Sequence, residues 1–541
     1  MRDWWRGAVI YQIYPRSFQD DSGDGIGDLP GITRRLGHIA ELGADAIWLS
    51  PIFTSPMRDM GYDVSDYLGI DPLFGTLAEF DALVAEAHRL GLKVIVDQVL
   101  SHTSDQHPWF KESRQSRENP RADWYVWTDP LPDGAPPNNW PSVFGGPAWE
   151  WDSRRRQYFL HNFLVEQPDL NFHNPEVQEA MLDTMRFWLD RGVDGFRLDT
   201  VNYYFHDSLL RSNPPLDPPP NEPAVNPYDM QLHLYSKTRP ENLGFLRKMR
   251  ALTDSYDARM LVGEVGEQGA RSTKIMAEYT QGTDRLHMAY SFALLSNDFT
   301  PDHLRETVEG FFEDGAGGWP CWSFSNHDVI RHVSRWAKST GMAEDPVARL
   351  AIAVLASLEG TICLYQGEEL GQTETDIEFE ELTDPPGIRF WPDYKGRDGC
   401  RTPMVWDDSA NGGFSTAKPW LPVKAPQLAR NVAAQEAIPG SILALYREIL
   451  GFRRGQPALR QGGTEWIDLP APLLAFHRAL DGDRLTCVFN LSATPVALTL
   501  GSDAGLVGPG SPHIDGRKLH LPEGGFGWLK STGEAPLTLT A

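Results

Sequence analysis

Eight short apolar segments, separated by stretches with helical periodicity, constrain the fold of this chain more than any other feature. They occupy residues 8–15, 44–51, 92–99, 192–199, 259–265, 286–292, 321–328 and 361–367, and the sixth is the weakest of the set. Amphipathic stretches such as LAEFDALVAEAHRLG and VQEAMLDTMRFWLDRG lie between them. Strands that alternate with helices form a parallel sheet, so the pattern predicts an α/β fold, a (β/α)8 TIM barrel.

Three parts of the chain depart from this alternation. Residues 103–172 lack helical period and predict an excursion domain after the third strand. Residues 204–240 contain SNPPLDPPPNEPAVNPYD, a proline-rich loop that is either a rigid wall or a disordered insertion. The last segments alternate apolar and polar residues and predict a small antiparallel β domain. We therefore expect a catalytic barrel of residues 1–102 and 173–461, an excursion domain of residues 103–172 and a C-terminal domain of residues 462–541.

The composition limits the possible partners. The formal net charge is −25, which disfavours nucleic acids and anionic membrane surfaces, and no apolar stretch reaches membrane-spanning length. The four cysteines lie far apart without metal-ligand spacing, as is typical of a reducing compartment. No signal peptide is evident at the N-terminus. We expect a cytoplasmic monomer or homodimer that binds small molecules.

Ionisable residues stand at the ends of five predicted strands. They are Asp97 and His102, Arg197 and Asp199, Glu264, His327 and Asp328, and Glu368 and Glu369. The carboxyl ends of barrel strands form the active-site rim. An acidic rim suits either metal-assisted hydrolysis or glycoside cleavage by two carboxyl groups. Because the chain has no HxH or HExxH motif, glycoside cleavage is the better interpretation.

The segments DQVLSH, GFRLDTVNY, LVGEV and FSNHD, in this order, resemble the four signature regions of the α-amylase family of glycoside hydrolases, family 13. GADAIWLSP, QPDLN and YQGEELG resemble further motifs of that family. QPDLN and DSGDGIGDL are similar to the branch that contains oligo-1,6-glucosidases and α-glucosidases. The resemblance covers essentially the whole chain, including the two additional domains.

The resemblance implies a catalytic role for three carboxyl groups. Asp199 corresponds to the nucleophile, Glu264 to the acid/base, and Asp328 to a third carboxylate that holds sugar hydroxyls. Arg197 shares a strand face with Asp199 and should keep it ionised. Glu264 lies among apolar residues, which raise the pKa of a carboxyl group as a proton donor requires.

The resemblance also implies a subsite for one terminal glucose. Its members are two hydroxyl-binding histidines, a carboxylate, a stacking aromatic and an arginine: His102, His327, Asp59, Tyr62 and Arg401. Arg401 is expected to pair with Asp59, and such a pair closes the pocket as an exo-acting enzyme requires. Phe163 is either a hydrophobic wall of this subsite or a core aromatic.

Thr200 follows the predicted nucleophile. In this branch, Val at that position is typical of α-1,6 cleavage and Ala or Thr of α-1,4 cleavage, although Thr is also an ordinary residue for a strand end. We therefore expect an exo-acting retaining α-glucosidase for maltose-like substrates. An α-1,6-specific oligo-1,6-glucosidase, or a glucosyltransferase or sucrose isomerase that uses the same covalent intermediate, remains an alternative. A non-catalytic relative does not fit, because Asp199, Glu264 and Asp328 are all present.

The segment DDSGDGIGD resembles the first half of a calcium-binding loop. The candidate ligands are Asp20, Ser22, Asp24, the carbonyl of Ile26, and Asp28. The closing glutamate is absent, and an ordinary turn is the alternative. The branch resemblance implies a structural divalent cation there, Ca²⁺ or Mg²⁺, and no organic cofactor. Ser101 replaces an Asn that ligates calcium in many α-amylases, which argues against that second site.

Overall fold

The computed structural model describes residues 3–216, 224–267, 269–314, 317–533 and 535–541. All eight predicted strands form one parallel sheet, and their bounds are β1 (Val9–Ile13), β2 (Ala46–Leu49), β5 (Lys93–Gln98), β9 (Gly195–Leu198), β10 (Met260–Val265), β11 (Met288–Ser291), β12 (Cys321–Ser323) and β13 (Thr361–Tyr365). The sheet runs β11-β10-β9-β5-β2-β1-β13-β12. A parallel bridge between Ala289 and Pro320 brings its two edges together, so the sheet is a nearly closed TIM barrel.

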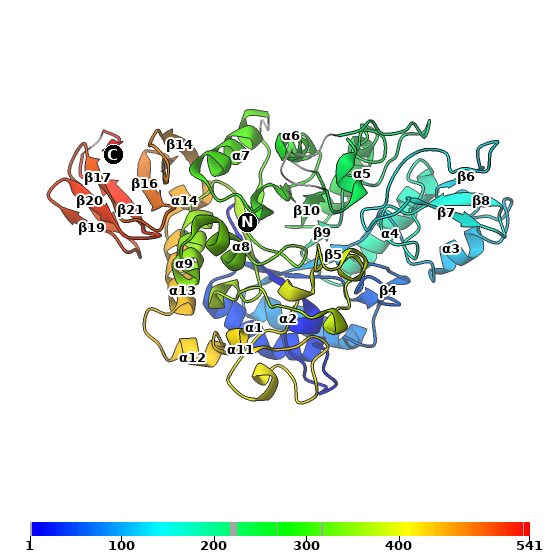
Figure 1. Cartoon of the computed structure of the whole chain (residues 1–541), viewed down its shortest axis with the longest axis horizontal. Coiled ribbons are helices and arrows are strands. Elements are labelled where there is room, and N and C mark those ends of the chain that lie inside the picture. Colours follow the sequence, from blue (N-terminus) through cyan, green and yellow to red (C-terminus); the bar gives the residue numbers. More distant parts are fainter. Residues whose placement is uncertain (1–2, 217–223, 268, 315–316, 534) are drawn as a thin grey trace.

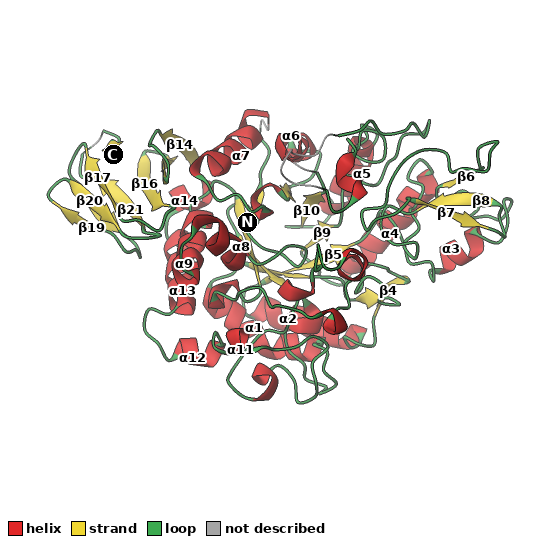
Figure 2. Cartoon of the chain, in the orientation of Figure 1, coloured by secondary structure: helices red, strands yellow, loops and turns green. Residues whose placement is uncertain are grey.

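Helices surround the barrel (Figure 2). The principal ones are α1 (Leu29–Leu42), α2 (Leu77–Arg89), α4 (Pro175–Asp190), α5 (Asn242–Asp254), α6 (Gly269–Thr280), α7 (Pro301–Asp314), α8 (His332–Thr340), α9 (Glu344–Leu355) and α13 (Ile442–Arg454). In α2, Thr76 and Glu79 form a capping box, and apolar residues from Phe80 to Ala87 face the sheet at helical spacing. None of the helices among the described residues combines the length and the apolar character that crossing a bilayer would require.

Residues between β5 and α4 form a separate lobe at the right of Figure 1. This lobe contains α3 (Pro108–Ser113) and a three-stranded antiparallel sheet of β6 (Trp127–Thr128), β8 (Gln157–Leu160) and β7 (Trp149–Asp152). Aromatic rings fill its interior, with Phe110 and Trp127 stacked at 5.7 Å. A short hairpin of β3 (Phe53–Thr54) and β4 (Asp66–Ile70) follows β2.

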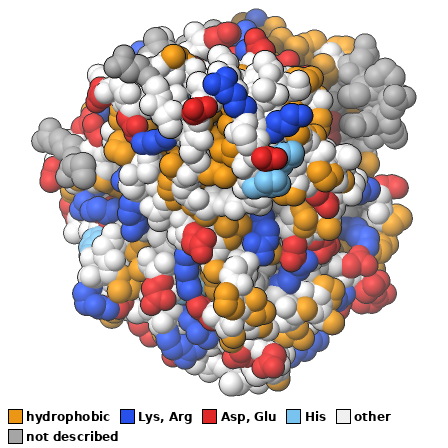
Figure 3. All heavy atoms as spheres, turned by 90° about the vertical axis from the view of Figure 1, so that its left-hand side faces the viewer, with side chains coloured by type: hydrophobic (Ala, Val, Ile, Leu, Met, Phe, Trp, Pro, Cys, Tyr) orange, Lys and Arg blue, Asp and Glu red, His pale blue; other side chains and the backbone are white. Residues whose placement is uncertain are grey.

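The C-terminal residues form two antiparallel sheets, at the left of Figure 1. Their strands are β14 (Gly463–Ile467), β15 (Leu473–Leu480), β16 (Asp483–Asn490), β17 (Val496–Leu500), β18 (Ala504–Val507), β19 (His513–Asp515), β20 (Lys518–Leu521), β21 (Phe526–Ser531) and β22 (Leu539–Thr540). Leu473, Val488, Leu498 and Leu529 share a core between the sheets. Acidic, basic and hydrophobic side chains are interspersed on the outer face of this end of the molecule (Figure 3).

A buried arginine joins the C-terminal sheets to the barrel. The Arg478 side chain, fully buried on β15, donates to the backbone oxygens of Ser357 at 2.6 Å and Leu459 at 3.2 Å. Trp528 Nε1 on β21 donates to Ser357 Oγ at 2.9 Å. Burial lowers the pKa of Arg478, because a charged guanidinium is costly away from water. The backbone oxygens of Ser357 and Leu459 supply hydrogen bonds in place of that water.

We predict that Arg478→Ala destabilises the protein by about 3 kcal/mol, because several buried carbonyl groups lose their donor. Denaturant unfolding of both proteins measures this difference. Arg484→Ala is the control, since Arg484 pairs with Glu465 at the surface and should change stability by less than about 0.5 kcal/mol. Equal losses in the two variants would contradict the assigned role of Arg478.

Candidate active site

A cavity of about 400 Å³ opens at the carboxyl ends of the barrel strands. The predicted site residues that line it are Asp59, Tyr62, His102, Phe163, Asp199, Thr200, Glu264 and Asp328. Segments outside the barrel complete the walls with Val143 and Phe144, Tyr203, Val225, Asn226 and Asp229, and Pro386, Phe390, Asp393, Tyr394 and Arg397. The described part of the proline-rich loop therefore reaches the cavity, whereas residues 217–223 of that loop lie outside the described residues.

Arg197 binds three carboxyl groups at the rim. The register of β5 and β9 places Asp97 opposite Arg197. Arg197 Nη1 lies 2.8 Å from Asp97 Oδ1 and 2.7 Å from Asp199 Oδ1, and its Nη2 lies 2.6 Å from Glu264 Oε1. Arg197 therefore contacts Asp199, but the pKa of that carboxyl group is raised, so the expectation that Arg197 keeps Asp199 ionised is not met. The contact with Glu264 was not predicted, and it brings both carboxyl groups to one guanidinium.

Burial and crowding of negative charge set the protonation of this cluster. Burial raises the pKa of Glu264 to about 7, with Arg197 opposing the shift and Asp199 adding to it. Burial likewise raises the pKa of Asp199 to about 7, again against Arg197. The raised pKa of Glu264 agrees with the prediction from its apolar neighbours. Each of these carboxyl groups therefore holds a proton more readily than an exposed one, because a second negative charge beside the first is unfavourable away from water.

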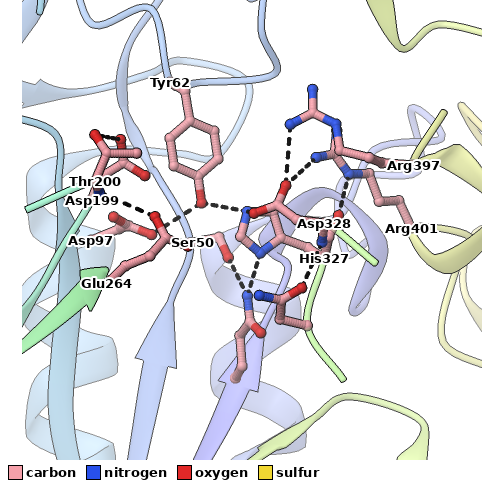
Figure 4. Close-up of polar contacts among 12 residues, drawn as sticks. Ser50, Tyr62, Asp97, Asp199, Thr200, Glu264, His327, Asp328, Arg397 and Arg401 are labelled. Carbon is pink, nitrogen blue, oxygen red and sulfur yellow. Dashed lines mark hydrogen bonds and ion pairs between the residues drawn. The ribbon is translucent and has the colours of Figure 1, made fainter. Parts of the chain in front are cut away.

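Asp328 lies on the other side of Tyr62 from this cluster (Figure 4). Its Oδ1 accepts from Arg397 Nη1 at 3.1 Å and from Arg401 Nη2 at 3.0 Å. Burial alone would raise the pKa of Asp328, but His327 and the two arginines hold it well below its usual value. Asp328 is therefore a permanent carboxylate, in contrast to Glu264.

The predicted ion pair between Arg401 and Asp59 is wrong. Arg397 Nη2 contacts Asp59 Oδ1 at 2.9 Å, and the Arg397 guanidinium lies over the Phe144 ring at 4.9 Å from its centroid. Arg401 is buried behind the cavity, where its Nε donates to the His327 backbone oxygen at 2.7 Å. A 3-10 helix, Asp398–Cys400, separates the two arginines, so only Arg397 reaches the cavity.

The two predicted histidines occupy different positions. His102 lines the cavity, with Nδ1 2.8 Å from Ser101 Oγ and its ring 5.2 Å from Phe163. His327 stacks on Tyr62 and lies behind it, with Nε2 2.6 Å from the Tyr62 hydroxyl, and is not among the lining residues. Direct contact of His327 with a sugar would require Tyr62 to give up this hydrogen bond.

Several functional residues were not found from the sequence. Gln167 Nε2 donates to Asp59 Oδ2 at 3.1 Å and lies 3.2 Å from His102 Nε2, so it joins two predicted binding residues. Gln167 is the first residue of the QPDLN motif, but that motif predicted only the branch of the family. Phe144 and Arg397 carried no motif that marked them for the cavity.

Glu368 and Glu369 do not reach the cavity. Glu369 Oε1 accepts from the Tyr11 hydroxyl at 2.7 Å, and Glu368 Oε1 accepts from the Tyr365 amide at 2.9 Å. Burial raises the pKa of Glu368 to about 8. These two carboxyl groups hold the turn that follows the carboxyl end of β13, and neither lines the cavity.

The candidate cation ligands lie in a loop that ends at the N-terminus of α1. Asp20 accepts from the amides of Gly23 and Gly25, and Asp28 caps α1 and accepts from the Ser22 amide. Within the part of the chain that the structure describes, no three His, Cys, Asp or Glu side chains are grouped to hold a metal. The loop is thus held by its own hydrogen bonds and by Ser415 Oγ, which donates to Asp20 Oδ2 at 2.6 Å.

The model of the alpha-amylase catalytic domain matches residues 12–462. The chain belongs to the alpha-amylase family of glycoside hydrolases. A probable alpha-glucosidase of Rhizobium meliloti (strain 1021) is 60% identical over 91% of this chain and 90% of its own length. An oligo-1,6-glucosidase of Heyndrickxia coagulans is 38% identical, with coverages of 93% and 95%.

Solved structures of family members have the same fold. The alpha-glucosyl transfer enzyme XgtA is 52% identical and superposes with a TM-score of 0.94, covering 98% of this chain and 99% of its own. The trehalulose synthase MutB from Pseudomonas mesoacidophila MX-45 is 34% identical with a TM-score of 0.87, covering 97% and 99%. The chain is therefore a glycoside hydrolase by family, and its relatives bear the names of both hydrolases and transfer enzymes.

We predict that Tyr290→Phe moves the alkaline limb of the kcat/KM profile upward by about 0.5–1 pH unit. The Tyr290 hydroxyl donates to Glu264 Oε1 at 2.9 Å and stabilises the carboxylate, so its loss raises the pKa of Glu264. As a proton donor Glu264 must be protonated, and the variant should stay active to higher pH. The profile is measured with p-nitrophenyl α-glucoside.

Tyr256→Phe is the matched control for this pH experiment. The Tyr256 hydroxyl also donates to a carboxylate, Asp190, at 2.7 Å, but on the surface. An alkaline limb that stays in place or moves downward in Tyr290→Phe would contradict the assignment of Glu264 as the proton donor.

Proposed function

We propose that this protein is an exo-acting, retaining α-glucosidase that cleaves terminal α-glucosidic bonds of short oligosaccharides. The observation that carries the proposal is the ion pair of Arg397 and Asp59, which stands at the cavity together with Phe144. A charged pair backed by an aromatic ring closes one end of the site, so a sugar chain can enter by its non-reducing end only. We propose that Asp199 and Glu264, which line the same cavity, act on the bond of the first glucose unit from that end.

The geometry supports a two-step mechanism. Glu264 donates its proton to the glycosidic oxygen while Asp199 attacks the anomeric carbon, and the leaving group departs with its new hydrogen. Glu264, now a carboxylate, next takes a proton from water as the water oxygen attacks and Asp199 leaves. Arg197 touches both carboxyl groups and can balance the charge as it passes between them. Asp328 stays ionised throughout and accepts hydrogen bonds from sugar hydroxyls.

Thr200 supports a preference for α-1,4 bonds. It lines the cavity next to Asp199, with Oγ1 3.2 Å from Asp199 Oδ2 and 3.2 Å from Ser101 Oγ. Replacing this hydroxyl by the methyl of Val would change both shape and hydrogen bonding beside the nucleophile, an exchange that discriminates by about 10–200-fold. The relatives bear names of both kinds, maltase and oligo-1,6-glucosidase, so an α-1,6 preference is the second candidate.

Transfer to a sugar acceptor is the other activity that we propose. XgtA is titled an alpha-glucosyl transfer enzyme and MutB a trehalulose synthase, and both match this chain over nearly their full lengths. The same glucosyl ester on Asp199 serves hydrolysis and transfer. We expect hydrolysis to dominate at low sugar concentration and transfer to increase as acceptor accumulates.

We also propose that the enzyme acts on small glucosides in the cytoplasm, as a monomer or a homodimer. All four cysteines are buried and free, which agrees with a reducing compartment.

Maltose and isomaltose, given in parallel and followed by proton NMR of the anomeric signals, test the proposed function. We predict that maltose is consumed at least about tenfold faster, which is within the discrimination that one pocket group supplies. α-Glucose should appear before mutarotation, because two displacements at the anomeric carbon retain its configuration.

Three outcomes would revise the proposal in different ways. Faster cleavage of isomaltose would remove the α-1,4 assignment and leave the glucosidase intact. New glucosidic linkages in excess of free glucose from the first minutes would make the enzyme a transferase. An Asp199→Ala variant with unchanged activity would overturn the mechanism.

The divalent cation at the loop of residues 20–28 stays a prediction. If the site binds Ca²⁺ or Mg²⁺, millimolar cation should raise the unfolding temperature by about 2 °C or more over the value in EDTA. Asp24→Ala should abolish this difference, because Asp24 is an exposed member of the proposed ligand set. Equal unfolding temperatures in EDTA and in either cation would contradict the prediction.

A further inference from the structure

A buried lysine stands behind the wall of the cavity. Lys237 is 3% exposed, and its Nζ donates to the Gly266 backbone oxygen at 2.6 Å and to the Tyr203 hydroxyl at 3.2 Å. Gly266 and Tyr203 both line the cavity. The ion pair that Lys237 makes, with Glu267 Oε1, is long at 3.8 Å. Most of the solvation that this ammonium lost on burial is therefore replaced by groups of the cavity wall.

Two tyrosines pack around Lys237, which lies near the end of the proline-rich loop. The hydroxyls of Tyr203 and Tyr228 lie 2.6 Å apart, and the Lys237 ammonium is 5.0 Å and 5.4 Å from the two ring centroids. Such distances allow attraction between the cation and both rings. Asn226 accepts from the Tyr228 amide and donates to the Val143 backbone oxygen at 2.7 Å. The Lys237 ammonium thus contacts both Tyr228 of the proline-rich loop and the cavity wall at Tyr203 and Gly266.

The same contacts reach the catalytic residues through the backbone. Tyr203 N donates to the Thr200 oxygen at 2.9 Å, and Thr200 N donates to Glu264 Oε2 at 3.1 Å. Gly266, two positions after Glu264, also donates its amide to Asn202 Oδ1 at 2.9 Å. A Cβ at Gly266 would lie 3.0 Å from Tyr203 Cε2, so this close contact favours glycine there.

We propose that Lys237 is a positioning residue for the acceptor, and that through Tyr203 and Gly266 it favours a sugar hydroxyl over water. This inference rests on the proposed α-glucosidase function. Whether the attacking group is a sugar hydroxyl or water, its oxygen forms a bond to the anomeric carbon and its proton passes to Glu264. The ester bond to Asp199 breaks, and the electron pair stays on the Asp199 oxygen. A sugar acceptor, unlike water, needs an ordered wall to bind, and Tyr203 and Gly266 form the wall beside Thr200 and Glu264. The part of the cavity along this wall is the acceptor half.

α-Glucosyl fluoride separates these steps, because its leaving group occupies little of the acceptor half. With a 13C-labelled donor, fluoride release measures formation of the ester and labelled free glucose measures its hydrolysis, so the difference is transfer to added unlabelled glucose. In Lys237→Met we expect kcat/KM for the fluoride to stay within about twofold and the acceptor KM to rise about tenfold, the equivalent of one charge-assisted hydrogen bond.

Maltose hydrolysis supplies an independent readout. The second glucose of maltose leaves through the half of the cavity in which an acceptor binds. Microscopic reversibility therefore requires kcat/KM for maltose hydrolysis to fall by a similar factor in Lys237→Met. A lysine that merely stabilises the fold would lower activity on glucosyl fluoride and maltose alike.

Tyr203→Phe and Lys248→Met complete the series. Tyr203→Phe keeps the ring and removes the hydroxyl that Lys237 and Tyr228 share, and should raise the acceptor KM by about threefold or more. Lys248 is an exposed lysine on α5 that contacts Gln178, and its replacement should change nothing. If Lys237→Met does not fold, Tyr203→Phe alone decides the question.

An unchanged acceptor KM in the folded variants would overturn the inference, as would a parallel loss of activity on glucosyl fluoride. If the unaltered enzyme releases no fluoride from the donor, the proposed function fails instead, and the two failures are distinguishable.

Discussion

The contact of one guanidinium with three carboxyl groups is the interaction on which the active site depends. Arg197 is completely buried and touches Asp97, Asp199 and Glu264, which come from three neighbouring strands. Without this cation, three buried carboxyl groups in such proximity could not hold the negative charge that catalysis requires. With it, the charge remains incompletely balanced, so the pKa values of Asp199 and Glu264 stay near neutrality, where a proton can be given and taken.

A second cationic centre completes the site at the opposite side of Tyr62 (Figure 4). Arg397 and Arg401 share the carboxylate of Asp328 and hold its pKa low, while Tyr62 donates to Asp97 on one side and lies against His327 on the other. The proposed nucleophile Asp199 and proton donor Glu264 thus lie beside Arg197, whereas Asp328, which stays charged, lies beside Arg397 and Arg401. Because these dipoles and charges are oriented before substrate arrives, little reorganisation is needed during reaction.

Segments outside the barrel then decide which sugars reach this chemistry. Phe144 and Phe163 come from the lobe between β5 and α4, Asn226 from the proline-rich loop, and Arg397 from the segment after the last strand. Relatives with the same barrel bear the names of hydrolases and of transfer enzymes. In this chain the rim and the walls come from different segments, so the walls can differ in sequence without any change in the rim.

The sequence by itself determined the barrel and the carboxyl groups that meet at its cavity, because strand periodicity and strand-end residues such as Asp199 and Glu264 can be recognised locally, without knowledge of packing. Contacts between distant segments could not be predicted in this way. Arg397 and Arg401 are four residues apart in the chain. The turn of the 3-10 helix between them places Arg397, and not Arg401, beside Asp59. The sharing of Arg197 with Glu264 likewise follows from the alignment of adjacent strands. Tertiary structure decides such partners because hydrogen-bond geometry depends on positions that residues far apart in the chain acquire only on folding.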